Sequence, residues 1–319
     1  MKIDYKQIDK ELSPLSLFNR ITANFSSKCY FRLMSKLSRR EKVPLPENID
    51  CSNIWIDRED GTKMRMRVYK PLKMEKKGPA ILWIHGGGYA LCTPENGAPR
   101  CKRLIDESGA VIISPDYTLS VEKPYPAALD DCYLALKWLA ANAEELGARS
   151  DQIIVAGESA GGGMTAAIAL YARDKKEVNI AFHMPLYPMI DDRPTESSRE
   201  NDAPIWNARK NRTAWKLYLG SLYGTENVPI YAAPARTTDF SGLPPAVTFV
   251  GDLDPFYSEN TEYFDKMQKA GVDATCRVYK GCYHGFDVLF PETEISKKSM
   301  EESIETFNHA VETYFRAQP

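Results

Sequence analysis

The segment Gly157-Glu158-Ser159-Ala160-Gly161 has the residue types and spacing of a nucleophile turn, in which a serine sits on a sharp bend between a strand and a helix. Glycines flank the serine because side chains there would block the crossing backbones. The start of the following helix favours negative charge that develops beside the serine. We therefore predict that Ser159 attacks a carbonyl carbon, with Gly157, Glu158 and Gly161 as supporting residues. A glycine-rich turn with an ordinary serine is the plain alternative, because patterns this short also occur by chance.

A second glycine-rich segment, His85-Gly86-Gly87-Gly88-Tyr89, follows a short apolar run at residues 80–84. Three glycines let a backbone approach a substrate closely and point its N–H groups into a site. A flexible turn is the alternative, while a phosphate-binding loop would need a following Gly-Lys-Ser/Thr that is absent. We expect His85 and Gly86 to support the loop, His85 as an anchor rather than a base. The N–H groups expected to form an oxyanion hole belong to Gly87, Gly88 and Ala160.

An acid and a histidine follow the last two apolar runs of the chain. Asp254 comes shortly after residues 246–250, and His284 comes shortly after residues 274–279. Because the carboxyl ends of parallel strands meet at one edge of a sheet, both side chains should lie near Ser159. The order serine, acid, histidine is one in which catalytic triads occur.

Ser159, His284 and Asp254 are therefore the predicted catalytic residues. Asp252, two residues before Asp254, is the rival acid. Of the four histidines, His183 lies within a predicted strand and His309 on the last predicted helix, where structural roles are expected.

The elements that must position these residues alternate between apolar strands and amphipathic helices. This alternation predicts an α/β fold with a mostly parallel sheet of about eight strands, flanked by helices, with an antiparallel pair joined by Asp60-Gly61 at its start. The predicted strands are residues 52–56, 64–69, 80–84, 111–114, 152–156, 179–186, 246–250 and 274–279. The predicted helices are residues 127–143, 160–172, 258–269 and a last one that carries Met300, Ile304, Phe307 and Val311.

Two segments stand outside this alternation. Residues 1–45 carry ten Lys/Arg against four Asp/Glu, with apolar residues at helical spacing. We interpret them as two short helices of a cap, broken near Pro14, rather than as a membrane-surface helix. Residues 46–319 then form the catalytic domain, with an aromatic-rich insertion at about 191–243 that supplies the rest of the cap. The apolar positions of the first segment are Ile8, Leu12, Leu15, Phe18, Ile21 and Phe25.

Composition narrows the class of protein. The 41 Lys/Arg and 43 Asp/Glu give a net charge of −2, so nucleic acid is not an expected partner. The charged start of the chain and the lack of an apolar run of roughly 20 residues predict no stable membrane anchoring and a cytoplasmic location. Seven cysteines without a C-x-x-C pair predict reduced thiols. We expect no metal and no cofactor.

Together these segments resemble the bacterial hormone-sensitive-lipase branch (family IV) of the α/β-hydrolases. The match runs from about residue 79 to residue 286, and departs at Thr118 and Ser120-Val121, where the family commonly has Arg and Ala-Pro. The resemblance implies the α/β-hydrolase fold, a helical cap and a serine carboxylesterase that forms an acyl-enzyme. The matching segments are residues 85–88, 116–119, 125–128, 157–162, 254–255 and 284–286.

The expected partner is a small-molecule ester with an acyl chain of about two to eight carbons, because Trp and Tyr side chains of the cap would enclose a modest apolar pocket. An amidase, a peptidase or an acyltransferase on the same scaffold stays open. So do a binding protein that keeps the triad, and a homodimer.

Overall fold

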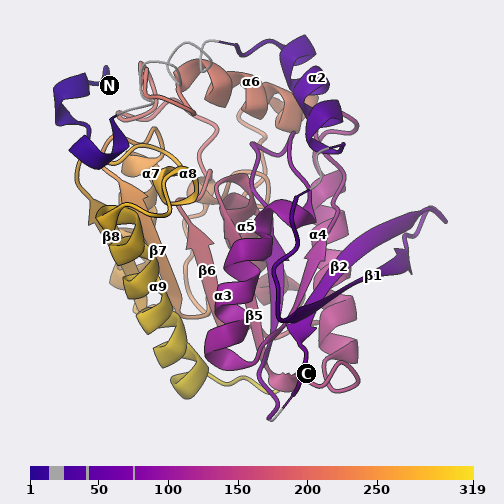
Figure 1. Cartoon of the computed structure of the whole chain (residues 1–319). Coiled ribbons are helices and arrows are strands. Elements are labelled where there is room, and N and C mark those ends of the chain that lie inside the picture. Colours follow the sequence, from indigo (N-terminus) through magenta and orange to yellow (C-terminus); the bar gives the residue numbers. More distant parts are fainter. Residues whose placement is uncertain (14–24, 41–42, 75) are drawn as a thin grey trace.

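The computed structural model describes residues 1–13, 25–40, 43–74 and 76–319. Its centre is an eight-stranded sheet with the order β1-β2-β4-β3-β5-β6-β7-β8 (Figure 1). β1 pairs antiparallel with β2, and β2 with β4, while all other neighbours are parallel. The strands are β1 (Ile49–Asp57), β2 (Lys63–Pro71), β3 (Pro79–Ile84), β4 (Val111–Pro115), β5 (Arg149–Glu158), β6 (Phe182–Leu186), β7 (Ala246–Gly251) and β8 (Ala274–Tyr279).

Helices cover both faces of the sheet, so the central strands are apolar on both sides. In β3 every residue is buried. Ala80 and Leu82 pack with α4 (Ala127–Asn142) and α5 (Ala160–Lys175), while Ile81 and Trp83 pack with α3 (Ala98–Ser108) and α9 (Glu294–Thr313) on the opposite face. The helices of the described chain are α2 (Lys28–Ser38), α3 (Ala98–Ser108), α4 (Ala127–Asn142), α5 (Ala160–Lys175), α6 (Ala208–Leu219), α7 (Tyr257–Lys269), α8 (Phe286–Leu289) and α9 (Glu294–Thr313).

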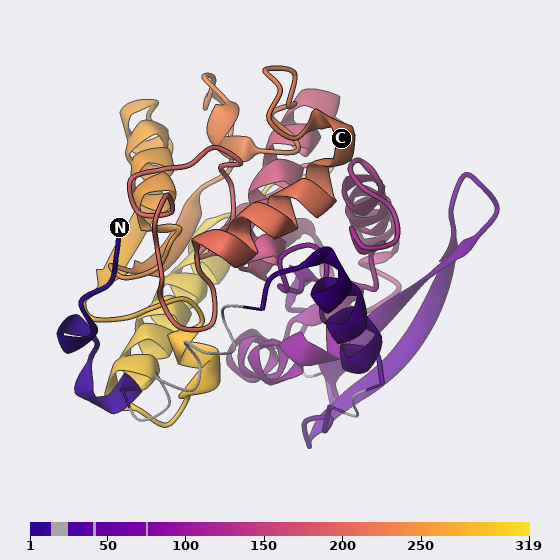
Figure 2. The same ribbon diagram turned by 90° about the horizontal axis from the view of Figure 1, so that it is seen from above.

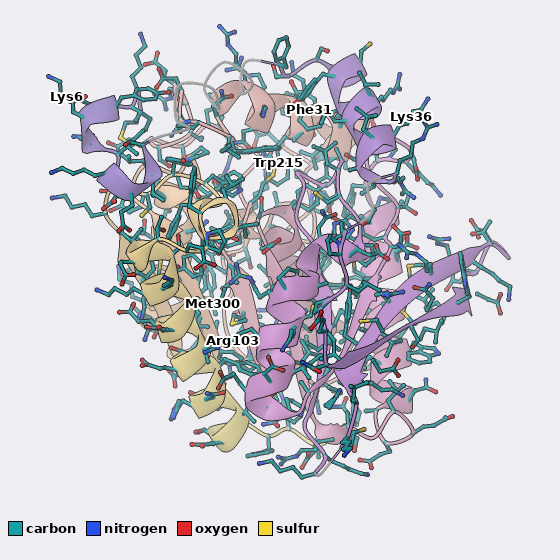
Figure 3. The ribbon with its side chains drawn as sticks, in the orientation of Figure 1. Lys6, Phe31, Lys36, Arg103, Trp215 and Met300 are labelled. Atoms are coloured by element: carbon teal, nitrogen blue, oxygen red, sulfur yellow. The ribbon has the colours of Figure 1, made fainter. Side chains whose placement is uncertain are left out.

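Two helices from distant parts of the sequence, α2 and α6, lie over the end of the sheet at which the parallel strands finish. Figure 2 looks down on both of them across this end of the molecule. Figure 3 shows Phe31 of α2 pointing inward and Lys36 pointing outward. Phe31 is fully buried, whereas Leu33 and Leu37 on the outer side of the helix are about half exposed. The inner side of α2 thus meets the region in which the predicted site residues gather.

The expected eight-stranded, mostly parallel sheet with an antiparallel start is confirmed, and so are the four helices that the sequence predicts. Several features differ. α3, between β3 and β4, and the short α8 were not expected, and the sequence did not locate α6 within the insertion. The sixth strand begins at Phe182 rather than at residue 179.

At the N-terminus, the helical spacing of Ile8 and Leu12 belongs to two 3₁₀ turns, Tyr5–Gln7 and Lys10–Leu12. The side chains of Asp4 and Asp9 cap these turns by accepting from the N–H groups of Lys6 and Glu11, which favours short turns over a continuous helix. The predicted positions Leu15, Phe18 and Ile21 lie outside the described residues.

No helix in the described ranges is both long and apolar enough to cross a membrane.

We predict that Ile154→Ala lowers the free energy of unfolding by about 2–5 kcal/mol, because Ile154 is fully buried in the central strand β5 and its loss leaves a cavity. The matched control is Val278→Ala on the edge strand β8, where the side chain is 45% exposed. That change should stay within about 0.5 kcal/mol of wild type. Urea unfolding at 25 °C measures both, and similar losses for the two variants would contradict the placement of β5 at the centre.

Candidate active site

Ser159 stands at the turn between β5 and α5, in a backbone conformation that side chains rarely adopt. Its φ is 57° and its ψ is −120°. Leu186 O accepts from the Ser159 N–H at 2.9 Å, and the Ser159 carbonyl accepts from the N–H groups of Gly163 and Met189 at 2.9 and 3.0 Å. These bonds hold the strained residue from three sides. A strained backbone conformation of this kind persists only where many surrounding contacts hold it, and such conformations are concentrated at functional sites.

The glycines around Ser159 are required by close backbone approach. A Cβ on Gly161 would lie 2.0 Å from Ile84 O, and one on Gly157 would lie 2.5 Å from the same atom. Both contacts are shorter than any real side chain makes. The end of β3 therefore packs directly against the turn that carries Ser159. This packing places the loop after β3 beside Ser159.

His284 and Asp254 complete a continuous hydrogen-bonded chain with Ser159. The His284 Nε2 atom lies 2.8 Å from Ser159 Oγ, and its Nδ1 atom lies 2.7 Å from Asp254 Oδ2. Because a carboxylate can only accept, the proton is on Nδ1 and the serine hydroxyl donates to Nε2. All three residues are buried. The edges of the Phe256 and Tyr187 rings meet the imidazole and fix its plane.

The two neighbouring acids, Asp254 and Asp252, have different partners. Asp254 is 1% exposed and accepts from the Phe256 N–H at 2.8 Å with its second oxygen. Asp252 accepts from the Gly281 N–H at 2.7 Å and so ties the end of β7 to the loop after β8. The geometry favours Asp254 over Asp252 as the partner of His284.

The loop after β3 turns sharply at its glycines. Gly87 has a φ of 104°, and a Cβ there would lie 2.4 Å from Leu91 O. Its carbonyl accepts from the N–H groups of Ala90 and Leu91, which closes the loop on itself. Within the described ranges, no hydrogen bond uses the N–H groups of Gly87, Gly88 or Ala160 as donors. Three donors are thus available close to the nucleophile.

His85 anchors this loop from below. It is fully buried, its Nδ1–H donates to Gly86 O at 2.9 Å, and its ring stacks on Tyr117 at 4.3 Å. Burial lowers the pKa of His85 to about 4, so the ring is neutral at neutral pH. The Tyr117 hydroxyl donates to the His85 carbonyl at 3.0 Å. His85 therefore shapes the loop, and no hydrogen bond in the described part of the chain joins it to Ser159.

An aromatic side chain from the insertion, Trp206, roofs the site. A Cβ on Gly88 would lie 2.3 Å from the indole, whose centre is 6.2 Å from that of the His284 ring. Phe31 of α2 meets Trp206 edge-on, with ring centres 6.2 Å apart. The preceding Ile205 has a φ of 68°, which is strained for a β-branched residue. The N-terminal segment and the insertion therefore each contribute an aromatic ring above the proposed oxyanion loop, residues 85–89.

Three polar side chains beneath the triad, those of Arg100, Tyr187 and Asp287, were not expected from the sequence. Arg100 of α3 pairs with Glu158 and Asp287, and the Tyr187 hydroxyl lies beside both carboxylates. Asp287 comes three residues after His284, so the sequence alone could have placed it near the site. Nothing in the sequence indicated Arg100, because the helix that carries it was not predicted. Among the described residues, no group of three or more His, Cys, Asp or Glu side chains is arranged to hold a metal ion.

Comparison with known proteins agrees with this geometry. Residues 81–288 match the family model described as the alpha/beta hydrolase fold. The esterase LipI of Mycobacterium tuberculosis is 33% identical over 69% of this chain and 70% of its own length, and the carboxylesterase NlhH of the same species is 33% identical over 70% and 72%. The solved structure of a bacterial heroin esterase aligns with a TM-score of 0.85, at 31% identity, over 96% of this chain and 99% of its own.

We predict that Asp254→Asn lowers kcat for p-nitrophenyl acetate by about 10⁴-fold, because an amide no longer holds the Nδ1–H tautomer of His284. Asp252→Asn is the matched control, since an amide oxygen still accepts from Gly281 and kcat should stay close to wild type. Steady-state kinetics on both variants measure this. A large loss confined to Asp252→Asn would reverse the assignment.

Proposed function

The chain belongs to the α/β-hydrolase family, in its hormone-sensitive-lipase-like branch, and is a carboxylesterase; we propose that it cleaves short- to medium-chain acyl esters through Ser159, His284 and Asp254. The observation that carries this proposal is the unbroken chain of hydrogen bonds from Ser159 Oγ through both nitrogens of His284 to Asp254. A serine in a strained turn, hydrogen-bonded to an imidazole that a carboxylate orients, is the arrangement that activates a hydroxyl for acyl transfer.

In the proposed reaction, Ser159 Oγ attacks the ester carbonyl while His284 Nε2 takes the hydroxyl proton. Asp254 stabilises the imidazolium that forms. The same proton then passes to the leaving alcohol, and an acyl-enzyme remains. Water attacks this ester in the second half, again with His284 as the base, and Ser159 is restored. The buried positions of all three side chains strengthen each of these interactions.

Three backbone N–H groups, those of Gly87, Gly88 and Ala160, are proposed to hold the oxyanion of the tetrahedral intermediates. The positive φ of Gly87 and Gly88 turns the loop back towards the nucleophile. Ala160 begins α5, so its N–H also carries the partial positive charge of a helix start. One donor of this kind contributes on the order of 3–4 kcal/mol to the transition state.

The substrate is proposed to be a small-molecule ester with an acyl chain of about two to eight carbons, because aromatic side chains of the cap confine the site. Trp206 lies against Gly88 and near His284, and it is held there by Phe31. Since Phe31 comes from the N-terminal segment and Trp206 from the insertion, the size of the pocket depends on both parts of the proposed cap.

Ser159→Ala should lower kcat for p-nitrophenyl acetate by about 10⁴–10⁶-fold, because the three side chains act as one unit. Parallel assays with the ester and the matching p-nitroanilide separate an esterase from an amidase. Near wild-type ester hydrolysis by Ser159→Ala would contradict the mechanism, and faster turnover of the anilide would contradict the substrate class.

Trp206→Ala should raise the ratio of kcat/KM for p-nitrophenyl octanoate over acetate by about tenfold, because removing the indole lengthens the apolar pocket. Trp55→Ala is the matched control, since Trp55 is 60% exposed on β1. A series of acyl chains from two to sixteen carbons gives the ratio. An unchanged ratio in Trp206→Ala, or a wild-type optimum on the longest chains, would contradict the proposed role of the cap.

A further inference from the structure

A buried group of four polar side chains, here called the arginine cluster, lies directly beneath the triad. It consists of Arg100, Glu158, Tyr187 and Asp287. Arg100 is 6% exposed, its Nη2 donates to Asp287 Oδ2, and its Nε lies 3.5 Å from Glu158 Oε2. The Tyr187 hydroxyl lies 3.4 Å from Asp287 Oδ2 and 3.5 Å from Glu158 Oε2. One guanidinium and one hydroxyl therefore bridge the same two carboxylates.

The members of the arginine cluster come from the segments whose relative positions determine whether the triad can form. Glu158 immediately precedes Ser159 on the nucleophile turn, and Asp287 follows His284 by three residues at the start of α8. Tyr187 is the first residue after β6, and its ring meets the His284 ring edge-on, with ring centres 5.3 Å apart. Arg100 projects from α3, which packs beside α9 (Figure 1), and its Nη1 lies 3.6 Å from Met300 Sδ.

Burying two carboxylates with one cation is costly, so the arrangement needs a reason. A buried ion pair is often no more stable than apolar residues of the same volume. Burial raises the pKa of Glu158 and Asp287 adds to the rise, while Arg100 opposes it, so the guanidinium offsets only part of the cost of burying this carboxylate. The loss of stability caused by this buried carboxylate has a functional reason if the cluster fixes the position of a reacting group. A shift of about 1 Å in such a group lowers the rate by on the order of 10²-fold.

We propose that the arginine cluster sets the distance between the His284 loop and the Ser159 turn, with Arg100 as a positioning residue for ester hydrolysis. Arg100 acts through its two carboxylate partners and touches neither the substrate nor the reacting atoms. Tyr187 passes the constraint to the imidazole by ring contact. This inference rests on the proposed function, because it concerns the same histidine and serine.

The test compares four proteins: wild type, Arg100→Met, the double variant Arg100→Met/Asp287→Asn, and Arg58→Met. The single change leaves buried carboxylates without their cation and should lower both the urea midpoint and kcat, the latter by about 10- to 100-fold with KM nearly unchanged. The double variant removes one orphaned charge and should regain stability. Its kcat should stay low, because the tether between the two loops is still absent.

Arg58→Met is the matched control. Arg58 follows β1 and forms a bidentate pair with the buried Asp131 of α4 at 2.6 and 3.0 Å, and among the described residues no hydrogen bond joins either side chain to Ser159, His284 or Asp254. Its loss should lower stability as Arg100→Met does and leave kcat close to wild type. A double variant whose kcat recovers together with its stability would overturn the proposal, because a purely structural cluster predicts that recovery.

A gentler variant covers the case in which Arg100→Met does not fold. Tyr187→Phe keeps the ring and removes only the hydroxyl that bridges both carboxylates, and it should lower kcat without changing KM. The Nδ1 proton resonance of His284, followed by NMR, reports on the imidazole without turnover and should shift in both Arg100→Met and Tyr187→Phe. Wild-type protein without ester hydrolysis would overturn the proposed function, whereas an unshifted resonance and unchanged kcat in Tyr187→Phe would overturn the role of the cluster alone.

Discussion

The backbone of Ser159 is held at positive φ by hydrogen bonds with Leu186, at the end of β6, and with Met189 in the following loop, while the end of β3 packs closely against the turn from the other side. This single constraint sets the positions of most other parts of the site. The Met189 N–H that binds the Ser159 carbonyl orders the loop after β6, and the Met189 carbonyl accepts from the Tyr89 hydroxyl of the oxyanion loop at 2.8 Å. The proposed nucleophile and the loop that carries its proposed oxyanion donors are therefore parts of one hydrogen-bonded unit.

The histidine reaches this unit from the loop that follows the edge strand β8, and several segments keep it there. The Gly281 carbonyl accepts from the Asp9 N–H at 3.0 Å, and the buried Tyr283 hydroxyl donates to the Leu12 carbonyl at 3.1 Å. The N–H of Ile3 donates to Asp202 in the insertion at 2.8 Å. Residues 1–13 thus join the histidine loop to the insertion, which links the triad to the segments that roof it.

The parts of this site that the sequence predicted are those whose chemistry is local. A glycine beside a serine, or an acid directly after an apolar strand, carries its meaning in a few neighbouring residues, so Ser159, Asp254 and His284 could be assigned from spacing. Contacts between elements that are distant in the sequence have no such local pattern. Arg100 is separated from Asp287 by 187 residues, and Phe31 meets Trp206 only because α2 folds back across the sheet. Their partners follow from packing, which no short pattern encodes.

The central claim is that one serine, activated by this geometry, forms a covalent acyl-enzyme. Peptide mapping by mass spectrometry after treatment with a fluorophosphonate tests it most directly, because the reagent bonds only to an activated nucleophile. The account predicts one adduct per chain, carried by the peptide that contains Ser159, and none in His284→Ala over the same exposure. An adduct on a different residue, or an unmodified wild-type protein, would contradict it.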